Sequence, residues 1–156
     1  MPIVHIGIGS NLTDKIFNCK DAIERMKQKG IAIKKISSMY ETEPWGVKDQ
    51  PKFINMAVEA ETDLSPKELL NTLKGIEKEM GRKEGEKWRE RIIDLDILFY
   101  NDMIMDNEEL KIPHPLLHKR AFVLMPLSEI AKDKVHPMLK KSVSEIWEDM
   151  KGDKVP

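Results

Sequence analysis

The chain has 156 residues, of which 40% are hydrophobic and 34% are charged, and this length favours one domain, residues 1–156, with its own buried core. Its 26 Lys and Arg against 27 Asp and Glu give a net charge of −1, which excludes a general attraction for nucleic acid or an anionic membrane. A single cysteine, no run of 18 apolar residues and no signal-peptide pattern predict a cytoplasmic protein.

The first half of the chain predicts a strand, a helix and two more strands. Apolar residues alternate over residues 3–8, and a turn is expected to begin at Gly9. Residues 13–29 carry apolar positions three or four apart, which is typical of an amphipathic helix. Residues 31–40 and 53–62 favour strands, with a long, turn-rich loop between them.

The second half adds a helix, a strong strand and a helical tail. A capping box opens a helix over residues 65–81, and β-branched and aromatic residues predict a strand at 92–100. We expect a turn that brings residues 103–105 back onto this strand, followed by helices at 120–131 and 142–150. This order predicts an α+β fold, a ferredoxin-like βαββαβ sandwich in which helices pack on an antiparallel sheet, with an extra C-terminal hairpin and helices.

The strongest sign of chemistry is an acidic pair in the strand predicted at residues 92–100. Alternation sends Asp94 and Asp96 to one face and the odd-numbered apolar residues from Ile93 to Phe99 to the other. Carboxylates on Cα atoms about 6.5–7 Å apart raise each other's pKa unless a cation lies between them. We therefore expect Mg²⁺, with phosphates of ATP completing its coordination. From this motif alone, a solvent-facing strand with two acidic residues is an equal alternative.

Basic residues on both sides of this strand suit a polyphosphate ligand. Arg82, Arg89 and Arg91 precede the acidic pair, and Arg120 follows it. For Arg82 and Arg89 alone, a solvated charged loop is the more frequent explanation, whereas Arg91 stands close to the pair. His114 lies between two prolines, which suits either a positioned donor near phosphate or a plain surface turn.

Residues 87–98 closely resemble the signature of the 6-hydroxymethyl-7,8-dihydropterin pyrophosphokinase family of the folate pathway. Further resemblances lie at residues 7–12, at 40–46 with 50–55, and at 112–127, in the same order along the chain. The resemblance implies a ferredoxin-like α+β fold. It also implies attack of the pterin hydroxymethyl oxygen on the β-phosphorus of ATP, which transfers pyrophosphate and releases AMP.

The resemblance assigns roles to individual residues. It implies two Mg²⁺ ions on Asp94 and Asp96, ATP as co-substrate, and Arg82 and Arg91 beside the acidic pair in catalysis. Two phenylalanines would stack on the faces of the pterin ring. The residues implied for ATP are Leu70, Glu77, Arg91, Ile97, Lys111, Ile112, His114 and Arg120, and those implied for the pterin are Thr42, Pro44, Trp45, Phe53, Asn55, Trp88, Asp94 and Phe122.

Two other classes of protein use similar features. A ferredoxin-like RNA-binding module would need a basic sheet face and an aromatic RNP-like motif, and the sequence has neither. A magnesium-dependent nuclease or nucleotidyltransferase could use the same acidic pair, with basic residues along a groove instead of around a pocket. We expect small-molecule substrates, no nucleic acid, no membrane and a monomer.

Overall fold

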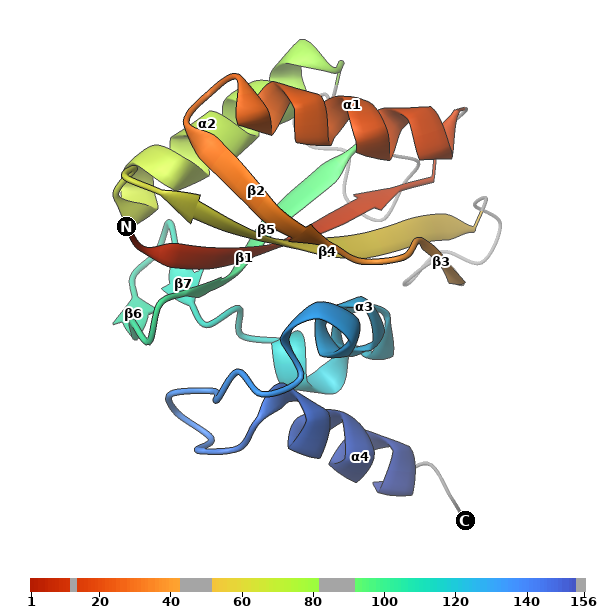
Figure 1. The fold of residues 1–156 in the computed structure, drawn as a ribbon, viewed down its shortest axis with the longest axis vertical. Helices are drawn as coiled ribbons and strands as arrows, with labels where there is room; N and C mark the ends of the chain where they lie inside the picture. The colour runs from red at the N-terminus through yellow and green to blue at the C-terminus, as the bar shows by residue number, and fades with distance from the viewer. Residues whose placement is uncertain (12–13, 43–51, 82–91, 154–156) are drawn as a thin grey trace.

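A five-stranded antiparallel sheet lies between two layers of helices in the computed structural model (Figure 1). The strand order is β2-β4-β1-β5, and β3 also pairs with β4. The structure confirms the ferredoxin-like order of elements predicted from the sequence. The strands are β1 (Ile3–Ser10), β2 (Ile31–Ile36), β3 (Tyr40–Thr42), β4 (Phe53–Thr62) and β5 (Asp94–Tyr100). The structure describes residues 1–11, 14–42, 52–81 and 92–153.

One face of the sheet is covered by α1 (Lys15–Lys27) and α2 (Pro66–Glu79). The predicted capping box starts α2, because the Glu68 amide donates to Ser65 Oγ at 3.2 Å and the Ser65 amide donates to Glu68 Oε1 at 2.8 Å. Between these helices and the sheet lies the larger hydrophobic core, which brings together apolar side chains from α1, α2 and the inner strands. Its largest fully buried members include Ile6, Ile8, Met26, Leu69, Leu73 and Ile76.

The opposite face carries α3 (Ala121–Ala131), and α4 (Val143–Asp153) packs outside it (Figure 1). Both helices were predicted near these positions. The second capping box is also present, since the Ser142 amide donates to Glu145 Oε1 at 2.9 Å and the Glu145 amide donates to Ser142 Oγ at 3.2 Å. A smaller apolar cluster joins this layer to the sheet. The sheet is therefore buried on both faces over much of its area.

Two predicted strand boundaries were wrong. β1 does not stop before Gly9 but continues to Ser10, because Gly9 pairs with residues of both neighbouring strands. The strand predicted at 31–40 is broken into β2 and β3, where the Ser38 amide leaves the ladder and donates to Glu129 at 3.0 Å. The pairing of Gly9 and the hydrogen bond from Ser38 to Glu129 of α3 both join segments that are distant in sequence, so the local pattern did not predict them.

The face assignment of Phe99 was also wrong. A register shift in the β1–β5 ladder lies between His5 and Ile6, which is a β-bulge or similar irregularity. Beyond it, Phe99 belongs to the cluster under α3, while Ile97 belongs to the core under α1 and α2. Strict alternation therefore holds for Asp94 to Ile97 but not to the end of the strand.

The C-terminal hairpin pairs different residues from those predicted. β6 (Met105–Asp106) pairs with β7 (Lys111–Ile112) in a separate two-stranded sheet and not with β5. A turn at Asn107 closes it, because Asn107 Oδ1 accepts the Glu109 amide at 3.0 Å. After β7, the short 3-10 helix η1 (Leu117–Lys119) leads into α3.

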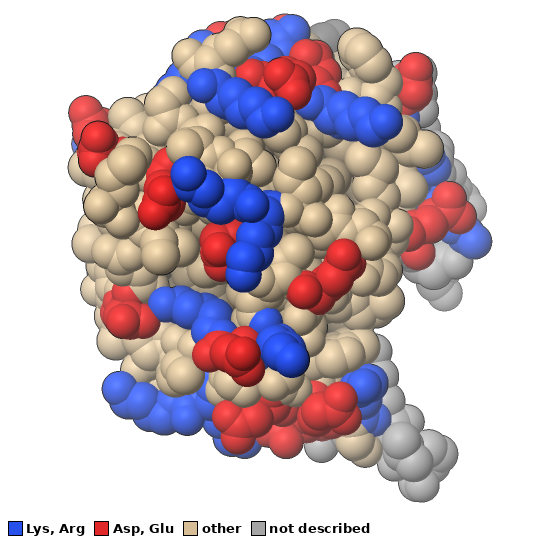
Figure 2. Space-filling view, in the orientation of Figure 1, with Lys and Arg blue, Asp and Glu red and all other residues tan. Residues whose placement is uncertain are grey.

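Charges of both signs share the face of the molecule seen in Figure 2. Lys34 lies 3.4 Å from Glu61, and Lys35 lies 3.8 Å from Glu59, so lysines of β2 are matched by glutamates of β4. This mixture fits the near-zero net charge. Among the described residues, no helix is long and apolar enough to cross a membrane.

Candidate active site

The acidic pair lies at the start of β5, on the sheet face that also carries Asn55. Asp94 is partly buried and Asp96 is exposed. The ladder places Asp94 opposite Gly9, and Gly9 opposite Asn55 on β4. Side chains at matching positions of neighbouring strands point to the same face. The structure thus brings the residues predicted for metal and the amide predicted for the pterin into one row across three strands.

Gly9 makes room in the middle of this row. A Cβ atom at this position would lie 3.0 Å from Asn55 Oδ1 and 3.7 Å from Phe53 Cδ1. A contact of 3.0 Å is tighter than nearly all real Cβ contacts, so any side chain here would push against the Asn55 amide. From the sequence, this glycine was expected only to begin a turn. Its role depends on cross-strand register, which the glycine alone does not reveal.

A buried glutamate of α2 fixes the backbone between the two aspartates. Glu77 is 8% exposed, and its Oε2 accepts a hydrogen bond from the Leu95 amide at 2.8 Å. In the described part of the sheet β5 is an edge strand, and no strand there pairs with this amide on that side. The resemblance assigned Glu77 to ATP and did not predict this contact. The one available signal was a carboxylate beside the apolar stripe that includes Leu73 and Ile76.

We expect Glu77→Ala to destabilise the protein by about 1–3 kcal/mol, because it leaves the Leu95 amide without its carboxylate acceptor. Turnover should also fall, by less than when an aspartate of the pair is changed. Glu77→Gln is the matched control, since its amide oxygen can still accept this hydrogen bond. Denaturant unfolding and steady-state kinetics of both variants test the idea, and equal stability of Glu77→Ala and the wild type would contradict it.

His114 lies close enough to Asp94 and to Arg120 for both charges to act on its imidazole. The His114 amide donates to the Leu98 carbonyl at 3.1 Å, and His114 Nδ1 accepts the Leu116 amide at 3.2 Å. Burial, and then the positive charge of Arg120, lower the pKa of His114 from 6.5 to about 4, while Asp94 acts in the opposite direction. The imidazole is therefore neutral at pH 7. Since Nδ1 is the acceptor, Nε2 carries the proton and can donate it in a hydrogen bond.

The lowered pKa of His114 predicts a pH-dependent stability. The unfolded chain binds a proton at this site near pH 6.5, and the folded chain only near pH 4. Neutral His114 therefore contributes its full share to the stability of the folded state above pH 6.5, and this share is lost as the pH falls from 6.5 to 4. The pKa values of His5 and His136 are also lowered, mainly by burial. We expect the free energy of unfolding to fall between pH 7 and pH 5, and His114→Asn to remove about 2 kcal/mol of that fall. Denaturant titrations at three pH values measure both slopes, and parallel slopes would refute the assignment to His114.

Phe122 lies in the first turn of α3, beside Arg120. The guanidinium carbon of Arg120 is 5.4 Å from the centroid of the Phe122 ring, which is a cation–π distance. Phe53, the other predicted stacking residue, begins β4 and is partly buried. The described part of the site thus has an aromatic residue on α3, another on β4, and the acidic pair on β5.

Other predicted residues are less clearly placed. The side chains of Ile97 and Ile112 are 4% and 1% exposed within the core, so only their backbones could touch a ligand. Lys111 Nζ lies 2.7 Å from Asp106, and Leu70 is a partly buried residue of α2. Thr42 ends β3. The predicted residues Arg82, Arg91, Pro44, Trp45 and Trp88 lie outside the described residues.

The acidic pair is a donor set suited to a hard divalent cation that shares its coordination with a ligand. Carboxylate oxygens are the donors that Mg²⁺ prefers, and Mg²⁺ is commonly held by one or two of them. Within residues 1–11, 14–42, 52–81 and 92–153, no group of three or more His, Cys, Asp or Glu side chains could hold a metal ion. A metal at Asp94 and Asp96 would therefore need further ligands from elsewhere.

A comparison of the sequence with models of protein families shows which family the chain belongs to. The family model of 7,8-dihydro-6-hydroxymethylpterin-pyrophosphokinase matches residues 5–132, which includes all the described site residues. The chain belongs to this pyrophosphokinase family. The resemblance noted from the sequence is thereby confirmed.

Relatives of similar length carry the corresponding name. The 2-amino-4-hydroxy-6-hydroxymethyldihydropteridine pyrophosphokinase of Aquifex aeolicus is 44% identical over 145 residues, which cover 93% of this chain and 90% of that protein. The Bacillus subtilis protein of the same name is 39% identical over 154 residues, covering 98% and 89%. A longer relative, the folic acid synthesis protein fol1 of Pneumocystis carinii, is 46% identical over 145 residues. The matched region is 93% of this chain but only 20% of that protein.

A solved structure confirms the fold. The Plasmodium falciparum HPPK-DHPS wild type with pteroate superposes with a TM-score of 0.78 at 16% identity, covering 95% of this chain and 44% of that chain. At this identity the likeness extends to the fold and not to individual side chains. The pyrophosphokinase domain of a larger protein therefore has the same architecture as this chain.

Proposed function

We propose that this chain transfers a pyrophosphoryl group from ATP to the hydroxymethyl group of 6-hydroxymethyl-7,8-dihydropterin and releases AMP, a step of folate biosynthesis. The observation that carries the proposal is the family match over residues 5–132, joined to 44% identity with a relative of nearly the same length. The acidic pair at the start of β5 could hold a divalent cation, which gives a physical reason for a phosphate substrate.

The reaction forms one bond and breaks one. The pterin hydroxymethyl oxygen bonds to the β-phosphorus of ATP, the bond from that phosphorus to the oxygen bridging the α-phosphorus breaks, and AMP leaves with that oxygen. The hydroxyl proton is lost to solvent or to a nearby base. Negative charge accumulates on the phosphate oxygens, so the protein contributes mainly by positioning the two substrates and by offsetting charge.

Asp94 and Asp96 would hold two Mg²⁺ ions between them and the phosphates. Bound Mg²⁺ neutralises phosphate charge and orients the phosphates. The backbone that carries both carboxylates is held in place, because the Leu95 amide between them is bound by Glu77 and the strand is paired to β1. This placement favours a metal site over the alternative, a solvent-facing strand that carries two acidic residues without a ligand.

Three groups would contact the substrates around this pair. His114, neutral and protonated on Nε2, would donate to a phosphate oxygen, and Arg120 would supply positive charge beside it. Asn55 would hydrogen-bond the polar edge of the pterin with its side-chain amide, which fits beside Gly9 because this residue has no side chain. Phe53 and Phe122 would stack on the two faces of the ring.

The metal requirement can be tested directly. Protein treated with EDTA and then returned to buffer should turn over ATP and hydroxymethyldihydropterin only after Mg²⁺ is added. Titration with Mn²⁺, followed by electron paramagnetic resonance in the presence of a non-hydrolysable ATP analogue, should count two bound ions. A single ion would correct the stoichiometry, and full turnover in EDTA would overturn the metal role.

A further inference from the structure

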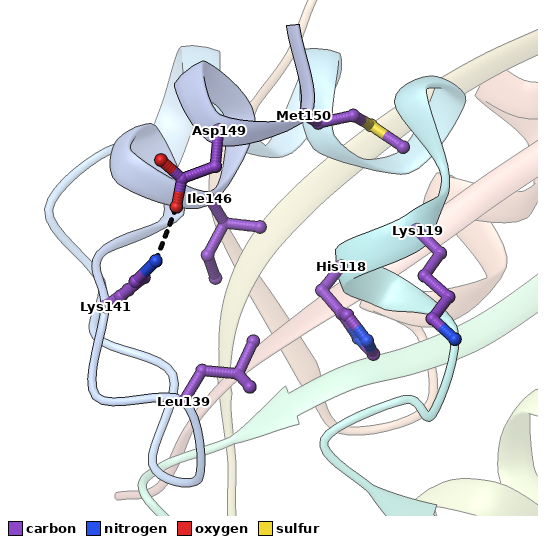
Figure 3. Close-up of a pocket in the computed structure, with 7 residues that line it drawn as sticks. All are labelled: His118, Lys119, Leu139, Lys141, Ile146, Asp149 and Met150. Carbon is purple, nitrogen blue, oxygen red and sulfur yellow. Dashed lines mark hydrogen bonds and ion pairs between the residues drawn. The ribbon is translucent and has the colours of Figure 1, made fainter. Parts of the chain in front are cut away.

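A cavity of about 480 Å³ lies between η1 and α4, on the side of the sheet that carries α3. The loop that precedes α4 forms its third wall (Figure 3). Its lining contains none of the residues predicted for ATP, metal or pterin. Sites for small molecules commonly have volumes of about 300–1,000 Å³ with an apolar lining and a few polar groups. The volume of the cavity therefore suits a small molecule.

The apolar part of the lining comes from α4 and the loop. Ile146 is 5% exposed and forms a floor, while Met150 lies one helical turn further along α4. Leu139 reaches the cavity from the loop and is 41% exposed, although it is a large aliphatic side chain. A ligand with an apolar body would cover these three side chains and remove their surface from water.

The polar part of the lining is unequal in charge. Lys141 Nζ and Asp149 Oδ2 are 2.6 Å apart and neutralise each other on one side of the cavity. Across from them, Lys119 and His118 project from η1 (Figure 3). No carboxylate of the described residues pairs with Lys119. The net charge on that wall is therefore positive, which favours an anionic group on the ligand.

His118 is held as part of the wall. Its ring lies edge-to-face against His136, with centroids 6.5 Å apart, and His136 lies edge-to-face against Phe99 of the sheet at 5.7 Å. His136 Nδ1 also accepts the Leu139 amide at 3.1 Å, so the same histidine steadies the loop. The positive wall and the apolar wall are thus fixed relative to each other before any ligand binds, which lowers the entropic cost of binding.

We propose that this cavity is a second ligand site, which binds a small organic anion with an aromatic or branched apolar body. The anionic group lies at Lys119 and His118, and the body lies on Ile146, Leu139 and Met150. This site is separate from the proposed reaction site and does not depend on the roles proposed for Asp94 and Asp96.

Naphthalene-2-sulfonate is a suitable probe, because it joins a flat apolar body to one permanent negative charge. It would be titrated into the full-length ¹⁵N-labelled protein, with amide shifts followed by NMR. We expect saturable shifts in residues 117–119 and 138–150. Lys119→Glu should weaken this binding by at least about tenfold through charge reversal. Leu139→Trp, which fills the cavity from an exposed position, should also weaken it.

Lys20→Glu is the matched control, because Lys20 is an exposed lysine of α1 on the other side of the sheet. It changes the net charge equally and should leave the affinity unchanged. Circular dichroism would verify that each variant is folded. The proposal is overturned if millimolar probe gives no saturable shifts around η1 and α4, if shifts occur only around Asp94 and Asn55, or if Lys119→Glu and Lys20→Glu bind the probe equally well.

Discussion

Replacing Asp94 or Asp96 with asparagine is expected to lower kcat by at least about a hundredfold while the protein stays folded. Asparagine keeps the size of the side chain but removes the charge that would hold Mg²⁺ against the ATP phosphates. Both positions lie on the accessible face of β5, Asp94 partly buried and Asp96 exposed, so the core does not depend on their charge. Steady-state release of AMP measures the effect.

Asp106→Asn provides the control for this pair. Asp106 is an exposed aspartate of β6, paired with Lys111 at 2.7 Å and away from the start of β5. Its substitution should leave kcat within about twofold of the wild type, since surface ion pairs contribute little. Near-normal turnover of either Asp94→Asn or Asp96→Asn would refute the assignment of metal to this pair.

The second large effect concerns Phe122. Phe122→Ala should weaken pterin binding by about 1–3 kcal/mol, because it removes one face of the proposed ring sandwich. Binding of an ATP analogue should change little, although Arg120 loses the ring that lies 5.4 Å from its guanidinium carbon. Isothermal titration calorimetry with each ligand separates these two affinities.

An exposed phenylalanine of α1, on the opposite face of the sheet from α3, serves as the comparison. Phe17 of α1 is 58% exposed, and Phe17→Ala should leave both affinities unchanged. Equal losses of pterin and nucleotide affinity in Phe122→Ala would mean that the ring organises the whole site and does not contact the pterin specifically.

Local signals in the sequence were sufficient for most of the fold. Ser65 with Glu68 and Ser142 with Glu145 form the capping boxes that their spacing predicted, because a capping box involves only residues three apart. Alternation over the first strand and over Asp94 to Ile97 gave the correct faces. The ferredoxin-like order followed from the succession of these elements.

Two of the misassigned features depend on contacts between distant segments, and the third is a local hairpin. Gly9 lies within a strand because it pairs with β4 and β5, and Phe99 changes face because the β1–β5 ladder shifts at His5. Residues 103–105 do not pair with β5, since the Asn107 turn pairs β6 with β7. The partners of Gly9 and Phe99 are distant in sequence, so local pattern could not identify them, whereas the β6–β7 hairpin is local and its register was misassigned.

Some features of the candidate site could be predicted from the sequence, and others depend on the packing of distant elements. The acidic pair and His114 stood out in the sequence, because two acids in an apolar strand and a histidine between prolines are unusual. The hydrogen bond from the Leu95 amide to Glu77 could not be predicted, since it requires the packing of α2 against the edge of β5. The roles of Arg82, Arg91 and Trp88 stay predictions from the family resemblance.

The identity of the nucleotide released tests the central claim most directly. The protein would be incubated with ATP, Mg²⁺ and 6-hydroxymethyl-7,8-dihydropterin, and the products separated by anion-exchange chromatography. We predict AMP in a one-to-one ratio with a pterin that has gained two phosphates, and neither product when the pterin is omitted. Release of ADP, or nucleotide turnover that does not depend on the pterin, would contradict the account.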